Sequence, residues 1–329
     1  MYAEVEVDLQ GIVDALRNYV EKGWSPVSIQ IREEPKLLEN PSREKIKPLR
    51  KTEAENIKFL AVDCSTRTLK RAHNWGIYVF RVAYALVQNR NVEWGYKEKL
   101  QFVPGDYLTR GRLLRSLRFE FESMMALEKL GLLSENDYLL LDGASYFGEK
   151  KGFAIMLYEK CQEKNLKLLA VSKQSPMLHD SKGRDLPATV YEMADYPIWI
   201  YHPVRKADKN VHLYGDVCLI KLCAESPRVF RCDIMDYLIE RNEPSEIVAP
   251  LTSISEDPRC LGYPIALWLA HDFSGISNSK LLYYHDQLEK LLKESGIYER
   301  IRREELSCNF PDELHGLKYP FEKELIEYV

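Results

Sequence analysis

The segment Phe59 to Ser65, with the sequence FLAVDCS, constrains the fold of this chain more than any other. Four consecutive apolar residues lead directly into Asp63. An apolar run of this length between polar residues is typical of a strand that is buried on both faces of a sheet. An unpartnered carboxylate is costly to bury. We therefore expect the strand to end at Asp63, at the mouth of a site, with Cys64 and Ser65 beginning a turn.

A second segment has the same form. The run YLLL from Tyr138 ends in Asp142, and Gly143 then permits a sharp turn. If the two strands are neighbours, their carboxylates meet at one sheet edge, where each raises the pKa of the other unless a cation holds them. We expect Asp63 and Asp142 to share a divalent metal ion. The alternative is that each Asp caps a turn or a following helix.

Composition limits the possible functions. The 329 residues suffice for one large domain or two small ones, and the net charge of −4 excludes a uniformly basic surface. Any nucleic-acid contact must then use local basic patches. The seven cysteines are scattered without a CxxC pair, which predicts a reducing, cytoplasmic setting. No signal peptide and no membrane-spanning run is expected.

The order of expected elements predicts an α/β fold. The first three strands, joined by short turns, predict an antiparallel meander, and a helical crossover predicts that the next two strands are parallel. The expected strands are 59–63, 75–87, 92–103, 138–142, 166–173, 198–202, 211–222 and 229–235. The expected helices are 4–22, 107–131, 150–164, 263–275 and 278–296. A charged connector is expected over 32–55, and a charged tail beyond 297.

A third carboxylate is expected from the helix over 107–131, with Glu120, Glu122 and Glu128 as candidates. Arg118 and Glu122 are four residues apart and share a helix face. They form either a surface ion pair of little energetic weight or part of the site. Three carboxylates suit magnesium or manganese. Two such ions about 3.5–4 Å apart can support phosphodiester hydrolysis.

Two further residues have alternative interpretations. Lys173 ends its strand as the two Asp residues end theirs, so it either holds a phosphate beside the metals or is a solvated lysine. His271 lies on an otherwise apolar helix. It is either a hydrogen-bonded residue of the core rim or a ligand or proton shuttle. The sequence contains no P-loop and no GxSxG motif, so a nucleotide-driven or serine-nucleophile mechanism is not indicated.

Five motifs in order resemble the NurA nucleases. They are AVDCS at Asp63, R-x-x-x-E-x-x-x-A from Arg118, LLLDGA at Asp142, AVSK at Lys173 and GYPIALWLAH at His271. The resemblance covers about residues 56–280 and implies an RNase H-like core with a mixed β-sheet plus helical and β-rich additions. The implied domains are an N-terminal helix and connector (1–55), a nuclease domain with insertions (56–280), and a C-terminal helix and tail (281–329).

The resemblance also implies an activity and partners. The implied activity is that of a deoxyribonuclease that depends on Mn²⁺, with Mg²⁺ as the alternative metal. It would act as a 5′–3′ exonuclease and as a single-strand endonuclease. The implied protein is a cytoplasmic homodimer that docks on the hexameric ATPase HerA during end resection of double-strand DNA breaks. It has no membrane partner.

The resemblance assigns roles by motif position. Asp63, Glu122 and Asp142 would be metal ligands, His271 a further ligand or catalytic residue, and Lys173 a contact near the scissile bond. Glu120 and Glu122 point about 200° apart on a helix, so only one of them can face the metals. Glu122 is preferred because its register fits Arg118 and Ala126. The predicted DNA-binding residues are Arg67, Arg71, Arg115, Arg118 and Lys173. A positive channel for DNA is expected from Arg67, Lys70, Arg71, Arg110, Arg112 and Arg115. Cys64 stands where the family usually has Gly.

Two other functions remain open at this point. An actin-like phosphotransferase also begins with a strand-end Asp followed by Ser and Thr, as in Asp63 to Thr66, but it repeats this motif with Gly-rich phosphate loops. Only Asp142-Gly143 resembles such a repeat. A non-catalytic subunit of a DNA-processing complex would share the fold, although the presence of all three acids argues against it.

Overall fold

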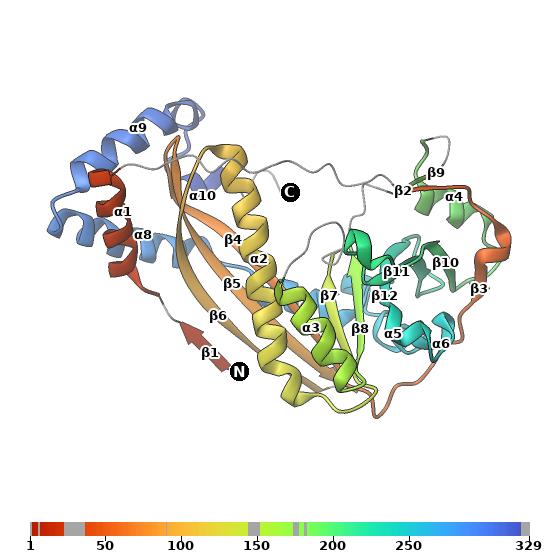
Figure 1. Cartoon of the computed structure of the whole chain (residues 1–329). Coiled ribbons are helices and arrows are strands. Elements are labelled where there is room, and N and C mark those ends of the chain that lie inside the picture. The colour runs from red at the N-terminus through yellow and green to blue at the C-terminus, as the bar shows by residue number, and fades with distance from the viewer. Residues whose placement is uncertain are drawn as a thin grey trace.

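The protein is built on one long mixed β-sheet with helices on both faces (Figure 1). The computed structural model describes residues 2–5, 7–22, 37–89, 91–143, 152–173, 178–180 and 183–323. Within these residues the sheet has ten strands. In spatial order they are β1 (Tyr2–Val5), β6 (Asn91–Pro104), β5 (Trp75–Gln88), β4 (Phe59–Arg71), β7 (Tyr138–Asp142), β8 (Lys167–Ser172), β12 (Phe230–Met235), β11 (Gly215–Lys221), β10 (Trp199–Arg205) and β3 (Ile46–Pro48). A small second sheet pairs β2 (Leu37–Glu39) with β9 (Leu178–Asp180).

The strand directions confirm the predicted topology. Strands β4, β5 and β6 form an antiparallel meander. Strand β7 runs parallel to β4, and β8 runs parallel to β7. From β12 to β3 every neighbouring pair is antiparallel. Strand β1 is parallel to β6. Between β6 and β8, the change from antiparallel to parallel pairing falls at β4, the strand that carries Asp63.

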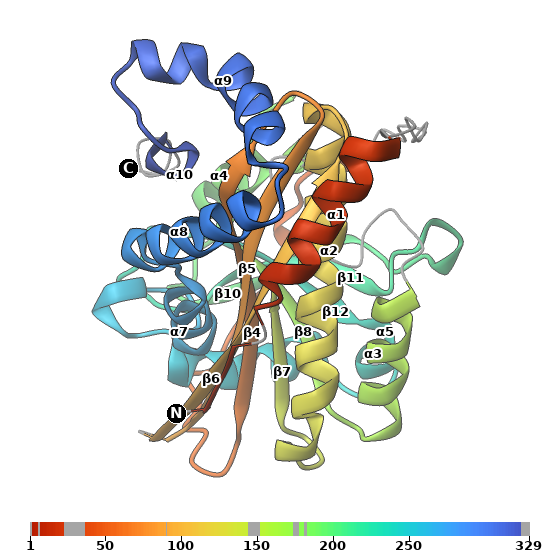
Figure 2. The same ribbon diagram turned by 90° about the vertical axis from the view of Figure 1, so that its left-hand side faces the viewer.

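Helices cover both faces of the meander (Figure 2). The long helix α2 (Tyr107–Lys129) and α3 (Gly152–Glu163) lie on one face, and α7 (Ile265–Ser274) and α8 (Asn278–Glu294) lie on the other. The remaining α-helices are α1 (Leu9–Lys22), α4 (Leu186–Met193), α5 (Asp236–Ile239), α6 (Pro244–Val248), α9 (Tyr298–Leu314) and α10 (Pro320–Lys323). No helix in the described part of the chain is long and apolar enough to cross a bilayer.

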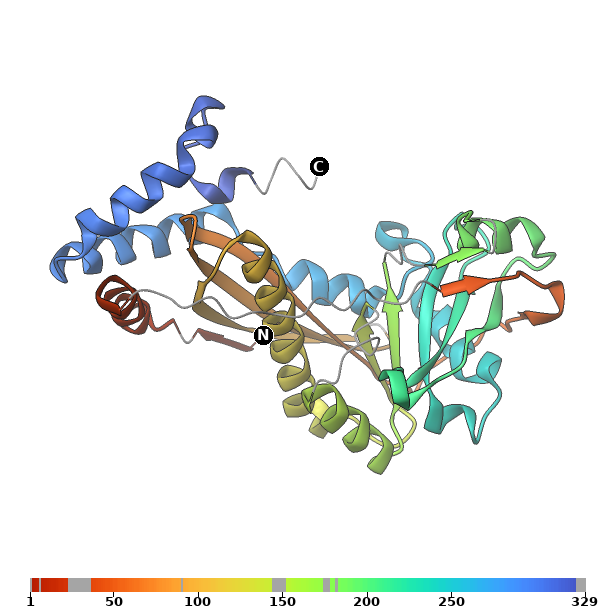
Figure 3. The ribbon, with the colours of Figure 1, turned by 45° about the horizontal axis from the view of Figure 1, so that its top comes forward.

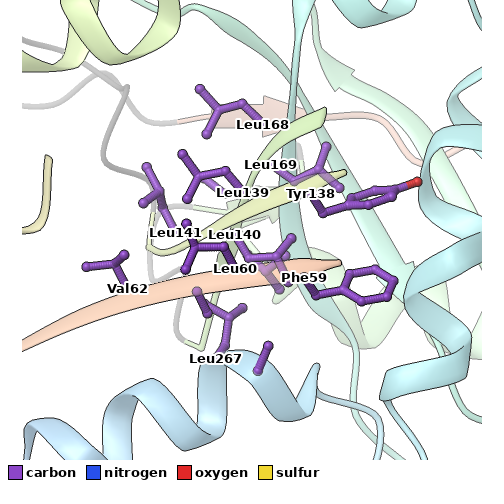
Figure 4. Close-up of a cluster of buried hydrophobic side chains, with 14 of the residues drawn as sticks. Phe59, Leu60, Val62, Tyr138, Leu139, Leu140, Leu141, Leu168, Leu169 and Leu267 are labelled. Carbon is purple, nitrogen blue, oxygen red and sulfur yellow. The ribbon is translucent and has the colours of Figure 1, made fainter. Parts of the chain in front are cut away.

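The main hydrophobic core lies around β4, β7 and β8. Leu60, Leu139 and Leu168 come from three adjacent strands and have no exposed surface. Leu267 of α7 packs on this cluster from below the strands in Figure 4. The uninterrupted apolar runs of β4 and β7 are thus explained by helices that cover both faces of the sheet.

A second core lies at the far end of the meander, where α1, α8, α9 and α10 gather (Figure 3). Leu16 of α1, Trp75 of β5, Leu288 of α8 and Ile301 of α9 are fully buried there. Phe321 of α10 is also part of this cluster. The C-terminal helices are therefore packed on the sheet and do not form a separate tail.

The prediction that β4 ends at Asp63 is wrong. The strand continues to Arg71 because β5 pairs with it as far as Arg71 opposite Gly76, with one register shift between Thr68 and Lys70. Pairing with β7, by contrast, stops at Val62 opposite Leu141. Asp63 therefore lies where β4 loses one neighbour and not where the strand itself ends.

The helix expected over 4–22 begins at Leu9, and Tyr2–Val5 forms strand β1, which pairs with β6. Two charged segments also differ from prediction. The charged stretch 32–55 contains β3, which forms the edge of the main sheet by pairing with β10. The charged tail beyond 297 contains the 17-residue helix α9. In both cases the ordering comes from tertiary contacts, which a local sequence pattern does not reveal.

Candidate active site

Asp63 and Asp142 lie side by side on neighbouring parallel strands. Val62 is opposite Leu141, so the same register continued by one residue places the two aspartates opposite each other. Asp63 is only 2% exposed, whereas the Asp142 side chain is 17% exposed. The prediction that the two apolar runs bring their carboxylates to one place is therefore confirmed by the register.

Asp63 accepts from three donors. His271 Nδ1 and Ser274 Oγ of α7 lie 2.7 and 3.4 Å from its Oδ2, and the Cys64 backbone N–H donates to Oδ1 over 2.9 Å. Arg118 Nη2 of α2 is 3.9 Å from Oδ1. Burial raises the pKa of Asp63, but the His271 hydrogen bond and the nearby cations outweigh this effect and hold the pKa below its ordinary value.

Asp142 also has a partner on each oxygen. Lys173 Nζ lies 2.7 Å from Oδ2, and the Tyr263 hydroxyl lies 3.2 Å from Oδ1. The strand geometry explains the lysine, because Val171 is opposite Asp142 and Lys173, two residues later, points to the same face. Burial, followed by the charge of Asp142, raises the pKa of Tyr263 well above its ordinary value, so this hydroxyl stays protonated as a donor.

Glu122 approaches from α2, the helix on the other face of the sheet. It is 8% exposed, and burial raises its pKa well above the usual value, with Asp63 and Asp142 adding to the shift and Arg118 opposing it. Glu120 is partly exposed, and Glu128 pairs with Lys97 at 2.9 Å on the surface. Of the three candidates, Glu122 is the one whose charge interacts with both aspartates.

The structure thus brings together most of the predicted site residues. Arg118 joins the carboxylates, and Arg115 is exposed one helical turn away on α2. Arg67 lies farther along β4, where it donates to the carbonyls of Ile276 and Phe321. Arg71 pairs there with Asp312 of α9.

The predicted basic channel is wrong for two of its members. Lys70 is 1% exposed and pairs with Glu289 and Glu305, and Arg110 is 6% exposed and donates to three backbone carbonyls. Both side chains point into the fold. The pattern of basic residues after Asp63 does not distinguish an exposed cation from one that is paired inside the protein.

Sequence analysis did not assign Tyr263 and Ser274 to the site. Tyr263 lies in the motif that contains His271, just before α7, and Ser274 follows His271 by one helical turn. These spacings can be read from the sequence, but the hydrogen bonds to the aspartates depend on how this segment docks on the sheet. Ser274 also lies 2.8 Å from the Ser65 hydroxyl, which ties α7 to β4.

The donor set fits a hard divalent cation. Within the described ranges no three His, Cys, Asp or Glu side chains stand close enough to form a complete metal site. Asp63 and Asp142 nevertheless lie side by side at the end of β7, and Glu122 of α2 interacts electrostatically with both. Carboxylate oxygens are the ligands that Mg²⁺ and Mn²⁺ prefer. The neighbouring Cys64 thiol is buried, and burial raises its pKa well above the usual value.

Fold and site together define a mixed α/β protein with an acidic cluster at the end of a central parallel strand. No family model and no curated protein matches the sequence. Among solved structures the chain is similar to the NurA nuclease from Sulfolobus solfataricus, with a TM-score of 0.58, 14% identity and coverage of 88% of this chain and 95% of the other.

Two further NurA structures agree with this result. One has a TM-score of 0.54 at 10% identity and covers 86% and 95% of the two chains. The other, described as NurA with manganese, has a TM-score of 0.50 at 11% identity and covers 87% and 97%. The chain has the NurA fold over 86–88% of its length.

The raised pKa of Glu122 predicts an unusual stability effect. Because the pKa of Glu122 is higher in the folded than in the unfolded protein, ionisation of this group lowers the free energy of unfolding. This destabilisation is absent below the pKa of the unfolded state. It grows as the pH rises towards the pKa of the folded state and is constant above that pKa. In EDTA, Glu122→Gln should therefore raise the free energy of unfolding at pH 8 by about 1–3 kcal/mol. The gain should disappear near pH 4.

Urea unfolding between pH 4 and 8.5 measures this effect. Glu120→Gln is the matched control, because Glu120 is two residues away on the same helix and partly exposed. A Glu122→Gln variant that is less stable than wild type at pH 8 would contradict the assigned environment.

Proposed function

We propose that this protein is a metal-dependent DNA nuclease that hydrolyses phosphodiester bonds. The observation that carries the proposal is that Asp63 and Asp142 lie side by side at the end of β7 and that Glu122 of α2 interacts electrostatically with both, in a chain with the NurA fold. An antiparallel meander followed by two parallel strands supports an RNase H-like classification of the core.

The three carboxylates would hold Mn²⁺ or Mg²⁺, with His271 as a further ligand or a catalytic group. Such ions, when bound, act as Lewis acids and lower the pKa of a coordinated water. His271 donates its Nδ1–H to Asp63, which orients the ring and leaves Nε2 to bind a metal or accept a proton. The His271 side chain is 56% exposed, so a substrate can approach it.

Cations at the rim would bind the phosphates of the substrate. Arg118 is 47% exposed and Lys173 is 35% exposed, and both already lie against the carboxylate cluster. Arg115 extends this basic edge along α2. Arg67 and Arg71 are engaged by the C-terminal segment, and their binding of DNA stays a prediction.

The finer assignments rest on the resemblance to NurA. They are Mn²⁺ as the metal, a two-metal mechanism, 5′–3′ exonuclease and single-strand endonuclease activity, homodimerisation, and action with HerA in end resection of double-strand breaks. The similar structure described with manganese supports the choice of metal. The NurA-like fold favours this function over the actin-like phosphotransferase.

Cleavage of labelled single-stranded and double-stranded DNA tests the proposal. Wild type should degrade DNA in Mn²⁺ or Mg²⁺ but not in EDTA, and Asp142→Asn should show no degradation above the EDTA background. Equal degradation by both proteins would place the activity elsewhere or in a contaminant. A folded wild type that is inactive with every metal, with and without HerA, would favour the non-catalytic subunit.

A further inference from the structure

The two oxygens of Asp142 are held by donors of different charge. Oδ2 accepts from the Lys173 ammonium at 2.7 Å, and Oδ1 accepts from the Tyr263 hydroxyl at 3.2 Å. Each carboxylate oxygen has about two lone pairs, so a neutral hydroxyl and a metal ion can share Asp142. An ammonium at hydrogen-bonding distance cannot share it in the same way, because it repels a dication a few ångströms away.

The other cations of the site are placed differently. Arg118 is 3.9 Å from Asp63, too far for a hydrogen bond, and is 47% exposed. His271 contacts Asp63 through one ring nitrogen, and an imidazole can bind a metal ion through its other nitrogen. Lys173 is therefore the one amine within hydrogen-bonding distance among the described contacts of the two aspartates.

The Lys173 side chain is also able to move away from Asp142. It is 35% exposed, and it consists of an ammonium on a flexible four-carbon stem. A swing about the stem carries the charge into solvent without moving β8, since the backbone of Val171 stays paired with Asp142 and Cys232.

We propose that Lys173 is an internal counter-ion that competes with the divalent metal for Asp142, and that metal binding releases it towards the phosphate of the substrate. This inference rests on the proposed metal site. Lys173 thereby lowers the affinity for metal and stabilises the metal-free protein. When a metal ion binds Asp142, the displaced Lys173 ammonium becomes free to contact a phosphate of the substrate.

Two variants separate this role from simple phosphate binding. Lys173→Met keeps the length of the stem and removes the charge, and Lys173→Arg keeps the charge. Lys209→Met is the matched control, because Lys209 pairs with Asp236 at 2.9 Å away from the site and is 59% exposed. Metal affinity is measured by calorimetric titration with Mn²⁺ in the absence of DNA.

Lys173→Met is expected to bind Mn²⁺ about tenfold more tightly than wild type, whereas Lys173→Arg and Lys209→Met stay within about twofold. In EDTA, Lys173→Met should melt at a lower temperature than wild type, and saturating Mn²⁺ should close this gap.

Unchanged or weaker Mn²⁺ binding by a folded Lys173→Met would overturn the counter-ion role while leaving the nuclease proposal standing. A wild type that binds neither Mn²⁺ nor Mg²⁺ would overturn the proposed function and this inference together.

Discussion

Asp63→Asn is expected to slow DNA cleavage by at least about a thousandfold while the protein remains folded. Asp63 is the central group of the site, since it contacts α7 through His271 and Ser274 and faces Arg118 of α2. Asparagine has the same shape but cannot supply a negative charge to a cation. The loss of several kcal/mol of transition-state stabilisation corresponds to this factor.

Single-turnover cleavage of labelled DNA at saturating Mn²⁺ measures the effect, with circular dichroism as the check of folding. Asp257→Asn is the control, because Asp257 pairs with Arg259 on the surface away from the cluster. Activity of Asp63→Asn within tenfold of wild type would remove Asp63 from the catalytic site.

Lys70→Met is expected to lower the free energy of unfolding by about 3–5 kcal/mol, the usual cost of breaking a buried ion pair. Lys70 Nζ lies 2.5 Å from Glu289 of α8 and 3.1 Å from Glu305 of α9, and the lysine is 1% exposed. Burial already raises the pKa of Glu305, and Lys70 opposes that shift. Without the lysine, two adjacent carboxylates face each other inside the protein.

Urea unfolding at pH 7.5 compares Lys70→Met with Lys47→Met. Lys47 pairs with Glu243 at 3.3 Å, with both side chains more than half exposed, so its loss should cost no more than about 1 kcal/mol. Adding Glu289→Gln and Glu305→Gln to Lys70→Met should recover part of the loss, because these changes remove the unpaired charges. Equal stability of the two single variants would show that the buried network contributes little.

The central strands could be predicted because an uninterrupted apolar run in the local sequence indicates burial on both faces of the sheet. The runs before Asp63 and Asp142 contain no polar residue, and only strands covered on both faces tolerate that pattern. The continuation of β4 to Arg71 could not be predicted in this way. Its basic residues look solvent-exposed, but acids that follow more than 200 residues later in α8 and α9 pair with Lys70 and Arg71.

The candidate site was predictable to a similar extent. The strand positions of Asp63 and Asp142 led directly to their proximity. The hydrogen bonds of Tyr263 and Ser274 depend on how α7 docks against the sheet, which is a long-range property without a local pattern.

The continuity of β4 has a consequence for any attempt to isolate a minimal fragment. The strand runs from the carboxylate cluster into the second core without a break. A fragment ending at residue 280, the expected domain boundary, would expose Trp75 and Leu69 to solvent. It would also leave the ammonium of Lys70 without its Glu289 partner. Helices α8 and α9 therefore belong to the unit that folds, although none of the assigned site residues lies on them.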